Sequence, residues 1–278
     1  MDRKETITNT EWDKQKKFIR LNTGINMAYV ERGNHEGENV IMLHGYSDSS
    51  RSYMNMMRAM ENKYHVYAVD LRGHGDTDKP KQFIYTMEQH VEDVTAFLNQ
   101  LGIEKFYVIG HSMGTLIAQG IGFSLPDRVK GIFLTSPLAR FHHNSDDMKS
   151  FDLLYEGFAE NPPAKEEWIP NYKAYFDQEF TDYLIEAAAE WPGYCWKAAW
   201  YGLESVDFTK FIYKITAPVM LVWGGMDDLV TKEHQEELKE LLPNAEYKIY
   251  PDNTHELNLE IPDIINDVIG FFEKIGEE

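Results

Sequence analysis

The sequence is poor in cysteine, in basic residues and in long apolar runs, and each shortage excludes a class of protein. Its 278 residues include a single cysteine, Cys195, so no intramolecular disulfide can form, as is usual in a reducing compartment. Lys and Arg number 27 against 46 Asp and Glu. The resulting net charge of −19 repels a polyanion on average, so we expect no nucleic-acid partner.

Two further absences concern membranes and export. No apolar run approaches the roughly 18–20 residues that a membrane span requires. The polar start, residues 1–17, has no apolar segment of the kind found in secretory signals, and we expect it to form a frayed or loosely docked arm. The sequence therefore predicts a cytoplasmic protein without a membrane partner.

What the sequence does contain is a regular alternation of short apolar strands and helices. Residues 18–32 alternate in polarity around Asn22-Thr23-Gly24, which predicts a β-hairpin. Six further apolar runs predict strands, and four amphipathic runs predict helices. The strands are expected at 39–45, 65–70, 106–110, 131–136, 218–224 and 247–251, and the helices at 87–102, 113–124, 232–242 and 261–274. This pattern predicts an α/β fold, with a mostly parallel sheet of about eight strands flanked by helices.

The alternation is interrupted once, at residues 138–214, where helical patterns occur without a convincing strand. This segment holds 18 of the 37 aromatic residues in little more than a quarter of the chain. We interpret it as a helical cap domain inserted into a core domain of residues 1–137 and 215–278. Its position between two strands places it where α/β sheets bind ligands, so Tyr194, Trp196 and Trp200 are candidate substrate-binding residues. The alternative is a peripheral bundle whose aromatic rings only fill its own core.

The strongest local signal is Gly110-His111-Ser112-Met113-Gly114, which follows an apolar strand and precedes a helix. A G-x-S-x-G sequence in a strand–turn–helix context is typical of a nucleophile elbow, which exposes the serine hydroxyl above a sheet. The turn is so tight that side chains at 110 and 114 would clash. The alternative is a glycine-rich turn with an idle serine.

A serine nucleophile needs a base, and the base needs an acid. His255 lies in the loop after the last predicted strand, where it can face Ser112. Asp227 and Asp228 follow the strand at 218–224, and one of them is expected to face His255. The order Ser, Asp, His along the chain is one that builds this geometry in known enzymes. The pair His142 and His143 has no spaced carboxylate or cysteine partner, so we predict no metal site there.

Acyl transfer also requires donors for the negative charge that develops on the carbonyl oxygen. The backbone N–H of Met113, at a helix start, is one candidate. The second is the N–H of Tyr46, in the loop after the strand at 39–45, where Gly45 lets the backbone approach a ligand.

Taken together, these residues resemble the α/β-hydrolase superfamily over positions 18–274. Five segments match in order: His44-Gly45, DLRGHGDTDKP at 70–80, GHSMG at 110–114, WGGMD at 223–227 and HELNLEIP at 255–262. The resemblance implies an α/β-hydrolase fold with a helical cap after the sixth strand. It selects Asp227 as the acid, because the family's acid lies three residues after the first glycine of the tryptophan–glycine motif. It also implies that Asp70 and Arg72 tie loops together.

The same resemblance narrows the reaction. Dehalogenases and epoxide hydrolases of the superfamily use an aspartate nucleophile, and proline iminopeptidases carry a GGSWG-type elbow; this chain has neither. It implies hydrolysis of a small-molecule ester or lactone without metal or organic cofactor. The stretch HGYSDSSRSY and the tryptophan-rich cap resemble serine esterases that open macrolide antibiotics. Alternatives are carbon–carbon bond hydrolysis, perhydrolysis, and a ligand receptor that retains the triad.

Overall fold

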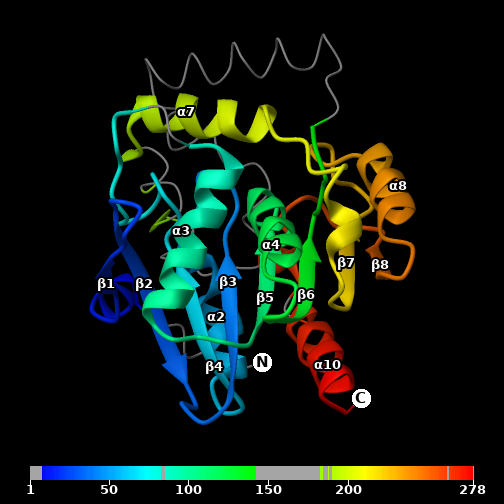
Figure 1. Ribbon diagram of the computed structural model, residues 1–278, viewed down its shortest axis with the longest axis horizontal. Helices are drawn as coiled ribbons and strands as arrows, with labels where there is room; N and C mark the ends of the chain where they lie inside the picture. Colours follow the sequence, from blue (N-terminus) through cyan, green and yellow to red (C-terminus); the bar gives the residue numbers. More distant parts are fainter. Residues whose placement is uncertain are drawn as a thin grey trace.

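An eight-stranded sheet forms the centre of the computed structural model, which describes residues 8–82, 85–141, 182–183, 187, 190–261 and 263–277. The strand order is β1-β2-β4-β3-β5-β6-β7-β8 (Figure 1). The strands are β1 (Lys17–Arg20), β2 (Asn26–Gly33), β3 (Glu38–Leu43), β4 (Tyr64–Val69), β5 (Phe106–His111), β6 (Val129–Thr135), β7 (Val219–Gly224) and β8 (Glu246–Tyr250). Each lies within a residue or two of a predicted strand, so the prediction of an eight-stranded sheet is confirmed.

The direction of the strands also agrees with the sequence pattern. β1 and β2 form the expected antiparallel hairpin, and β2 is antiparallel to β4. All other neighbours pair in parallel, from β4 and β3 across to β7 and β8. The carboxyl ends of the parallel strands therefore meet at one edge of the sheet, and their loops converge there.

Helices cover both faces of the sheet because the central strands are apolar on both sides. In β3, Ile41 and Leu43 belong to the core shared with helices α3, α4 and α8, whereas Val40 and Met42 belong to the core shared with α2 and α10. The helices are α2 (Met54–Met60), α3 (Met87–Gln100), α4 (Met113–Ser124), α7 (Gly193–Glu204), α8 (Lys232–Leu241), α9 (Leu257–Glu260) and α10 (Ile264–Glu277). The predicted helices correspond to α3, α4, α8 and α10, while α2 was not predicted.

The expectation of a frayed or loosely docked N-terminal arm is wrong for residues 8–17, the described part of that arm. A short helix, α1 (Asn9–Asp13), begins with a capping box at Thr8. Its Trp12 has no exposed surface and belongs to the core under α2. The ammonium group of Lys16 is buried and pairs with Asp70 Oδ2 at 2.9 Å and with Asp76. One large ring and one buried ion pair therefore dock the arm onto the domain.

The segment between β6 and β7 contains the predicted cap, and most of it, including His142 and His143, lies outside the described residues. The described helix α7 crosses above the carboxyl ends of the central strands (Figure 1). It packs closely on the loop before α3, since a Cβ at Gly202 would lie 1.9 Å from the carbonyl oxygen of Tyr85.

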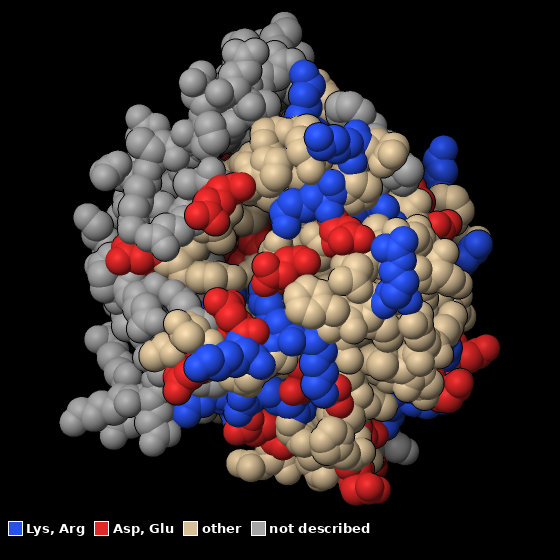
Figure 2. Space-filling view, turned by 90° about the vertical axis from the view of Figure 1, so that its left-hand side faces the viewer, with Lys and Arg blue, Asp and Glu red and all other residues tan. Residues whose placement is uncertain are grey.

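The edge of the molecule that carries β1 has charges of both signs. Figure 2 shows Lys and Arg side chains interleaved with Asp and Glu on this face. Ion pairs of the residues of β1 and β2 include Lys17 with Glu31 at 2.9 Å and Arg32 with Glu61 at 2.6 Å. Within the described ranges, no helix combines the length and apolar character needed to cross a bilayer.

Candidate active site

Ser112 occupies a strained turn between β5 and α4. Its φ and ψ angles are 49° and −118°, a conformation that costs energy for any residue with a side chain. A Cβ at Gly110 would lie 2.6 Å from the carbonyl oxygen of Gly114, and one at Gly114 would lie 2.1 Å from that of Leu43. Only glycine therefore fits at these two positions, for the steric reason given by the sequence pattern.

A continuous chain of hydrogen bonds joins Ser112 to two residues from distant loops. His255 Nε2 lies 2.8 Å from Ser112 Oγ, and His255 Nδ1 lies 2.9 Å from Asp227 Oδ2. His255 follows β8 and Asp227 follows β7, so both come from loops at the carboxyl edge of the sheet. The structure thus brings together the three side chains that the sequence proposed as nucleophile, base and acid.

Asp227 is held as an acceptor by its own loop. Its Oδ1 accepts hydrogen bonds from the backbone N–H groups of Leu229 and Val230, at 3.0 and 2.8 Å. Burial alone would raise the pKa of this carboxyl, but the His255 ring and the two N–H donors outweigh burial and hold the pKa below its usual value. Its neighbour Asp228 points into solvent, so only Asp227 is positioned to orient the imidazole.

The same pair sets the protonation of His255. Burial of the ring favours its neutral form, but the charge of Asp227 and the hydrogen bond to it outweigh burial and raise the pKa of His255. Because Nδ1 faces a carboxylate, Nδ1 carries the proton in the neutral ring and Nε2 is free to accept one from Ser112. This arrangement can serve as a general base.

Two residues that the sequence analysis missed hold the backbone of His255. The carbonyl oxygen of His255 accepts a hydrogen bond from His111 Nε2 at 3.1 Å and another from Ser136 Oγ at 2.7 Å. Burial lowers the pKa of His111, so its ring stays neutral. His111 and Ser136 lie at the ends of β5 and β6. A polar residue directly after a buried apolar strand is the sequence signal that marks them.

The loop after β3 lies against Ser112. A Cβ at Gly45 would lie 3.3 Å from the Cβ of Ser112, so the absence of a side chain permits this approach. His44 Nε2 accepts the N–H of Leu71 at 2.9 Å, so Nδ1 carries the proton and donates to the Gly45 carbonyl at 2.7 Å. Burial lowers the pKa of His44 to about 4, which keeps this ring neutral.

The direction of the Gly45 carbonyl determines the direction of the Tyr46 N–H, which is one of the two predicted oxyanion donors. The Gly45 carbonyl and the Tyr46 N–H belong to one peptide, and the described chain contains no cis peptide bond. In a trans peptide the two groups point in opposite directions, so the Tyr46 N–H is directed away from the His44 ring. The other predicted donor, the Met113 N–H, is the first of α4 and has no acceptor within the helix.

The predicted cap residues lie around the side chain of Tyr46. The Tyr46 hydroxyl donates to the carbonyl oxygen of Trp196 at 2.8 Å, and its ring makes edge contacts with Trp191, Trp196 and Trp200 at centroid distances of 5.3, 5.4 and 6.0 Å. Trp196 has no exposed surface and Trp200 is 4% exposed. In this conformation both rings pack against the Tyr46 side chain in the loop after β3 and leave almost no surface for a ligand.

Tyr194 and Cys195 occupy the first turn of α7. Tyr194 is partly buried and its hydroxyl donates to the carbonyl oxygen of Lys79 at 2.9 Å. Cys195 is fully buried, and burial raises the pKa of its thiol. A buried thiol with a raised pKa is a poor nucleophile, so Cys195 serves as a packing residue.

One group of potential metal ligands lies at the site itself. His111, His255 and Glu256 each offer an atom within 4.8 Å of the others. The Nε2 atoms of both rings, however, already face the His255 carbonyl and the Ser112 hydroxyl. The arrangement therefore suits proton transfer at Ser112.

Comparisons with known proteins identify the family to which the chain belongs. A family model described as "Serine aminopeptidase, S33" matches residues 34–262. The chain is 25% identical to Lipase 1 of Psychrobacter immobilis over 95% of this chain and 86% of the relative. It is also 25% identical to Epoxide hydrolase 4 of Homo sapiens, over 92% of this chain and 78% of the relative.

Solved structures share the fold. The structure of a putative lipase from Acinetobacter baumannii superposes with a TM-score of 0.84 at 22% identity, covering 95% of this chain and 92% of that one. A likeness at this identity shows the fold alone, whereas the family model spans most of the chain. The chain therefore belongs to the α/β-hydrolase superfamily of serine hydrolases, in the family described as serine aminopeptidase, S33.

Proposed function

We propose that this protein hydrolyses a carboxylic ester or lactone through an acyl-enzyme on Ser112, with His255 as base and Asp227 as its acid partner. The observation that carries the proposal is the unbroken hydrogen-bond chain from Ser112 Oγ through the His255 ring to Asp227. A neutral hydroxyl is a weak nucleophile, and a base within hydrogen-bond distance is what activates it.

In the acylation half, Ser112 Oγ attacks the carbonyl carbon while its proton passes to His255 Nε2. The carbonyl oxygen becomes an oxyanion, for which the N–H groups of Met113 and Tyr46 are the proposed donors. The carbon–oxygen ester bond then breaks, and the imidazolium gives its proton to the departing alkoxide. Asp227 stabilises the positive ring during this step and keeps its tautomer correct.

In the deacylation half, water takes the place of the alcohol. His255 accepts a proton from this water, whose oxygen attacks the acyl carbon. The tetrahedral intermediate collapses, Ser112 Oγ leaves and recovers the proton from His255, and the carboxylic acid is released. For a lactone, alcohol and acid remain one molecule, so the net change is the addition of one water.

We infer the substrate class from the composition of residues 138–214. We propose that this segment is a helical cap over a core of residues 1–137 and 215–278. The aromatic content of this segment favours a large apolar substrate. Its 14 acidic residues against seven basic ones favour a substrate that carries positive charge. A macrolide with an amino sugar has both properties, and its lactone is a bond that this chemistry can open.

Two other functions of this superfamily can be distinguished from ester hydrolysis. An epoxide hydrolase needs a carboxylate at the elbow, and the serine at position 112 argues against that reaction. A ligand receptor of the same fold would be acylated once and then stop. Steady turnover therefore separates an enzyme from a receptor.

The test is to incubate the purified protein with p-nitrophenyl esters, simple lactones and macrolides, and to follow p-nitrophenol release and the mass gain of one water. We expect turnover that is lost in Ser112→Ala, and a fluorophosphonate adduct on Ser112. An adduct elsewhere, or turnover that survives Ser112→Ala, would overturn the proposed nucleophile. A single stoichiometric acylation would favour the receptor.

A further inference from the structure

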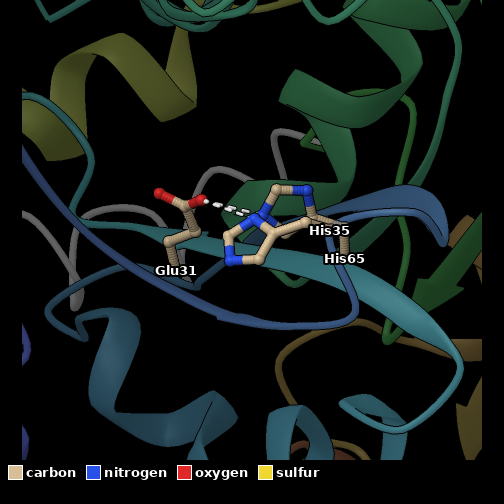
Figure 3. Close-up of side chains that lie close together, drawn as sticks. All are labelled: Glu31, His35 and His65. Atoms are coloured by element: carbon tan, nitrogen blue, oxygen red, sulfur yellow. Dashed lines mark hydrogen bonds and ion pairs between the residues drawn. The ribbon is translucent and has the colours of Figure 1, made fainter.

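A second cluster of histidine and carboxylate lies at the opposite end of the sheet from Ser112. Glu31 is on β2, His65 is the second residue of β4, and His35 belongs to the turn after β2. Figure 3 shows the Glu31 carboxylate pointing toward the two imidazole rings. The three ligand atoms lie within 4.8 Å of one another. Nothing in the proposed hydrolysis uses these side chains.

The distances suit a small cation. Glu31 Oε1 lies 2.8 Å from His65 Nε2 and 3.7 Å from His35 Nδ1. Two ligands of a tetrahedral Zn²⁺, each about 2.1 Å from the ion, lie roughly 3.4 Å apart. The distance from Glu31 to His65 is shorter than this ligand–ligand separation, and the distance from Glu31 to His35 is longer. Side-chain shifts of about half an ångström would bring both distances to the separation expected around the ion.

The backbone around the cluster is already fixed. The N–H of Asn34 donates to the carbonyl oxygen of Tyr64 at 3.1 Å, which ties the turn to β4. Gly33 has a φ of +100°, and a Cβ there would lie 2.3 Å from the same carbonyl oxygen, so only glycine allows this close turn. The imidazoles of His35 and His65 are thereby held 4.4 Å apart, centroid to centroid.

Neighbouring side chains orient two of these three potential ligands. The Tyr67 hydroxyl lies 3.2 Å from His65 Nδ1, and its oxygen can accept a hydrogen bond from Nδ1–H when Nε2 binds a metal. Lys17 pairs with the other carboxylate oxygen, Glu31 Oε2, at 2.9 Å and leaves Oε1 toward the rings. The His65 and Glu31 side chains are 10% and 14% exposed, whereas that of His35 is 73% exposed. An ion can therefore enter from solvent, which would supply the fourth ligand.

From this geometry we infer that Glu31, His35 and His65 form a binding site for Zn²⁺ or a similar divalent transition metal. Two imidazole nitrogens and one carboxylate oxygen are ligands that zinc commonly takes. The site would pin the turn between β2 and β3 to β4. Because it lies at the amino end of β4, far from the carboxyl edge with Ser112, its role is structural and it should stabilise the fold without changing turnover.

The test is calorimetric titration of the metal-free, full-length protein with Zn²⁺. We expect one ion per chain, and an affinity at least about 10-fold weaker in His35→Ala and in Glu31→Gln. His35 is exposed, so its replacement should leave the fold intact. Lys17→Gln should bind Zn²⁺ more tightly, because it removes a cation beside the site. Zn²⁺ should raise the melting temperature of the wild type and not of His35→Ala.

One control variant and one activity measurement distinguish Zn²⁺ binding at this cluster from binding at other histidines. The double variant His142→Ala/His143→Ala removes the other histidine pair noted in the sequence and should bind Zn²⁺ like the wild type. Zinc held by His111, His255 and Glu256 would inhibit hydrolysis and would persist in His35→Ala. Absence of binding at micromolar Zn²⁺, or binding that survives both His35→Ala and Glu31→Gln, would overturn the inference.

Discussion

His255 Nδ1 lies 2.9 Å from Asp227 Oδ2, while the adjacent Asp228 points into solvent. Two neighbouring carboxylates in one loop thus have different surroundings. We expect Asp227→Asn to lower kcat by about 10⁴-fold, because an amide cannot hold the imidazole in the required tautomer. Asp228→Asn is the matched control and should leave kcat within a few-fold of wild type. Ester hydrolysis rates of the two variants provide the measurement, and equal losses would mean that the acid is misassigned.

The raised pKa of His255 predicts the pH profile. The base works only when neutral, so kcat/KM should fall as pH drops through its pKa, and this acid limb should lie above pH 6.5. In Asp227→Asn the residual activity should lose most of this shift, because burial, which lowers the pKa of His255, is then opposed only by the smaller effects of the Glu256 and Asp228 charges. The acid limb should therefore move to lower pH. Profiles measured from about pH 5 to 9 test this, and an unmoved limb would assign the titration to another group.

The hydrogen bond from the neutral His44 ring to the Gly45 carbonyl predicts that His44 positions the Tyr46 N–H in the loop after β3. His44→Phe removes the hydrogen bond to the Gly45 carbonyl, so the Tyr46 N–H should lose its fixed direction. We expect kcat to fall by up to about 10²-fold with little change in KM, because an oxyanion donor acts mainly in the transition state.

The rescue variant for this prediction is His44→Asn. Its side-chain amide can still donate near the position of Nδ1, and it should recover part of the lost kcat. A purely structural role for His44 would instead lower stability in both variants and leave kcat of the folded protein unchanged. Steady-state kinetics alongside thermal unfolding separates these outcomes.

Local sequence was sufficient where sterics or burial act on neighbouring residues. The strands were predictable because unbroken apolar runs must be buried on both faces. The elbow at Ser112 was predictable because its flanking glycines are forced by contacts within one turn and with β3. The candidate site could therefore be anticipated down to Asp227 once the family resemblance had chosen between two adjacent carboxylates.

Sequence was insufficient where a residue acts through partners far along the chain. Trp12 is buried in the core that also includes residues of α2, and its ring lies under the Arg51 guanidinium; no local periodicity in the sequence predicts this burial. His111 and Ser136 reach the carbonyl of His255 only because three strand ends converge. The apolar pattern around α2 was too short to separate a helix from a loop.

The docked arm predicts a stability effect in a segment that the sequence led us to expect to be frayed or loosely docked. Trp12→Ala should lower the free energy of unfolding by about 3–5 kcal/mol, because it empties a fully buried site. Phe18→Ala is the control, since that ring is 56% exposed and its loss should cost less than about 0.5 kcal/mol. Urea unfolding of both variants gives the comparison. Similar small losses in both would show that the arm is frayed in solution.

The contacts of Tyr46 allow its backbone and side-chain roles to be separated. Tyr46→Phe removes only the hydroxyl that donates to the Trp196 carbonyl, so it should cost about 1 kcal/mol of stability and leave kcat for a small ester unchanged. Tyr46→Ala also removes the ring that packs against Trp191, Trp196 and Trp200. We expect it to lower kcat for small and large esters alike, because the loop that carries the N–H donor loses its support. A Tyr46→Ala variant with full activity on a small ester would show that these rings do not position the loop.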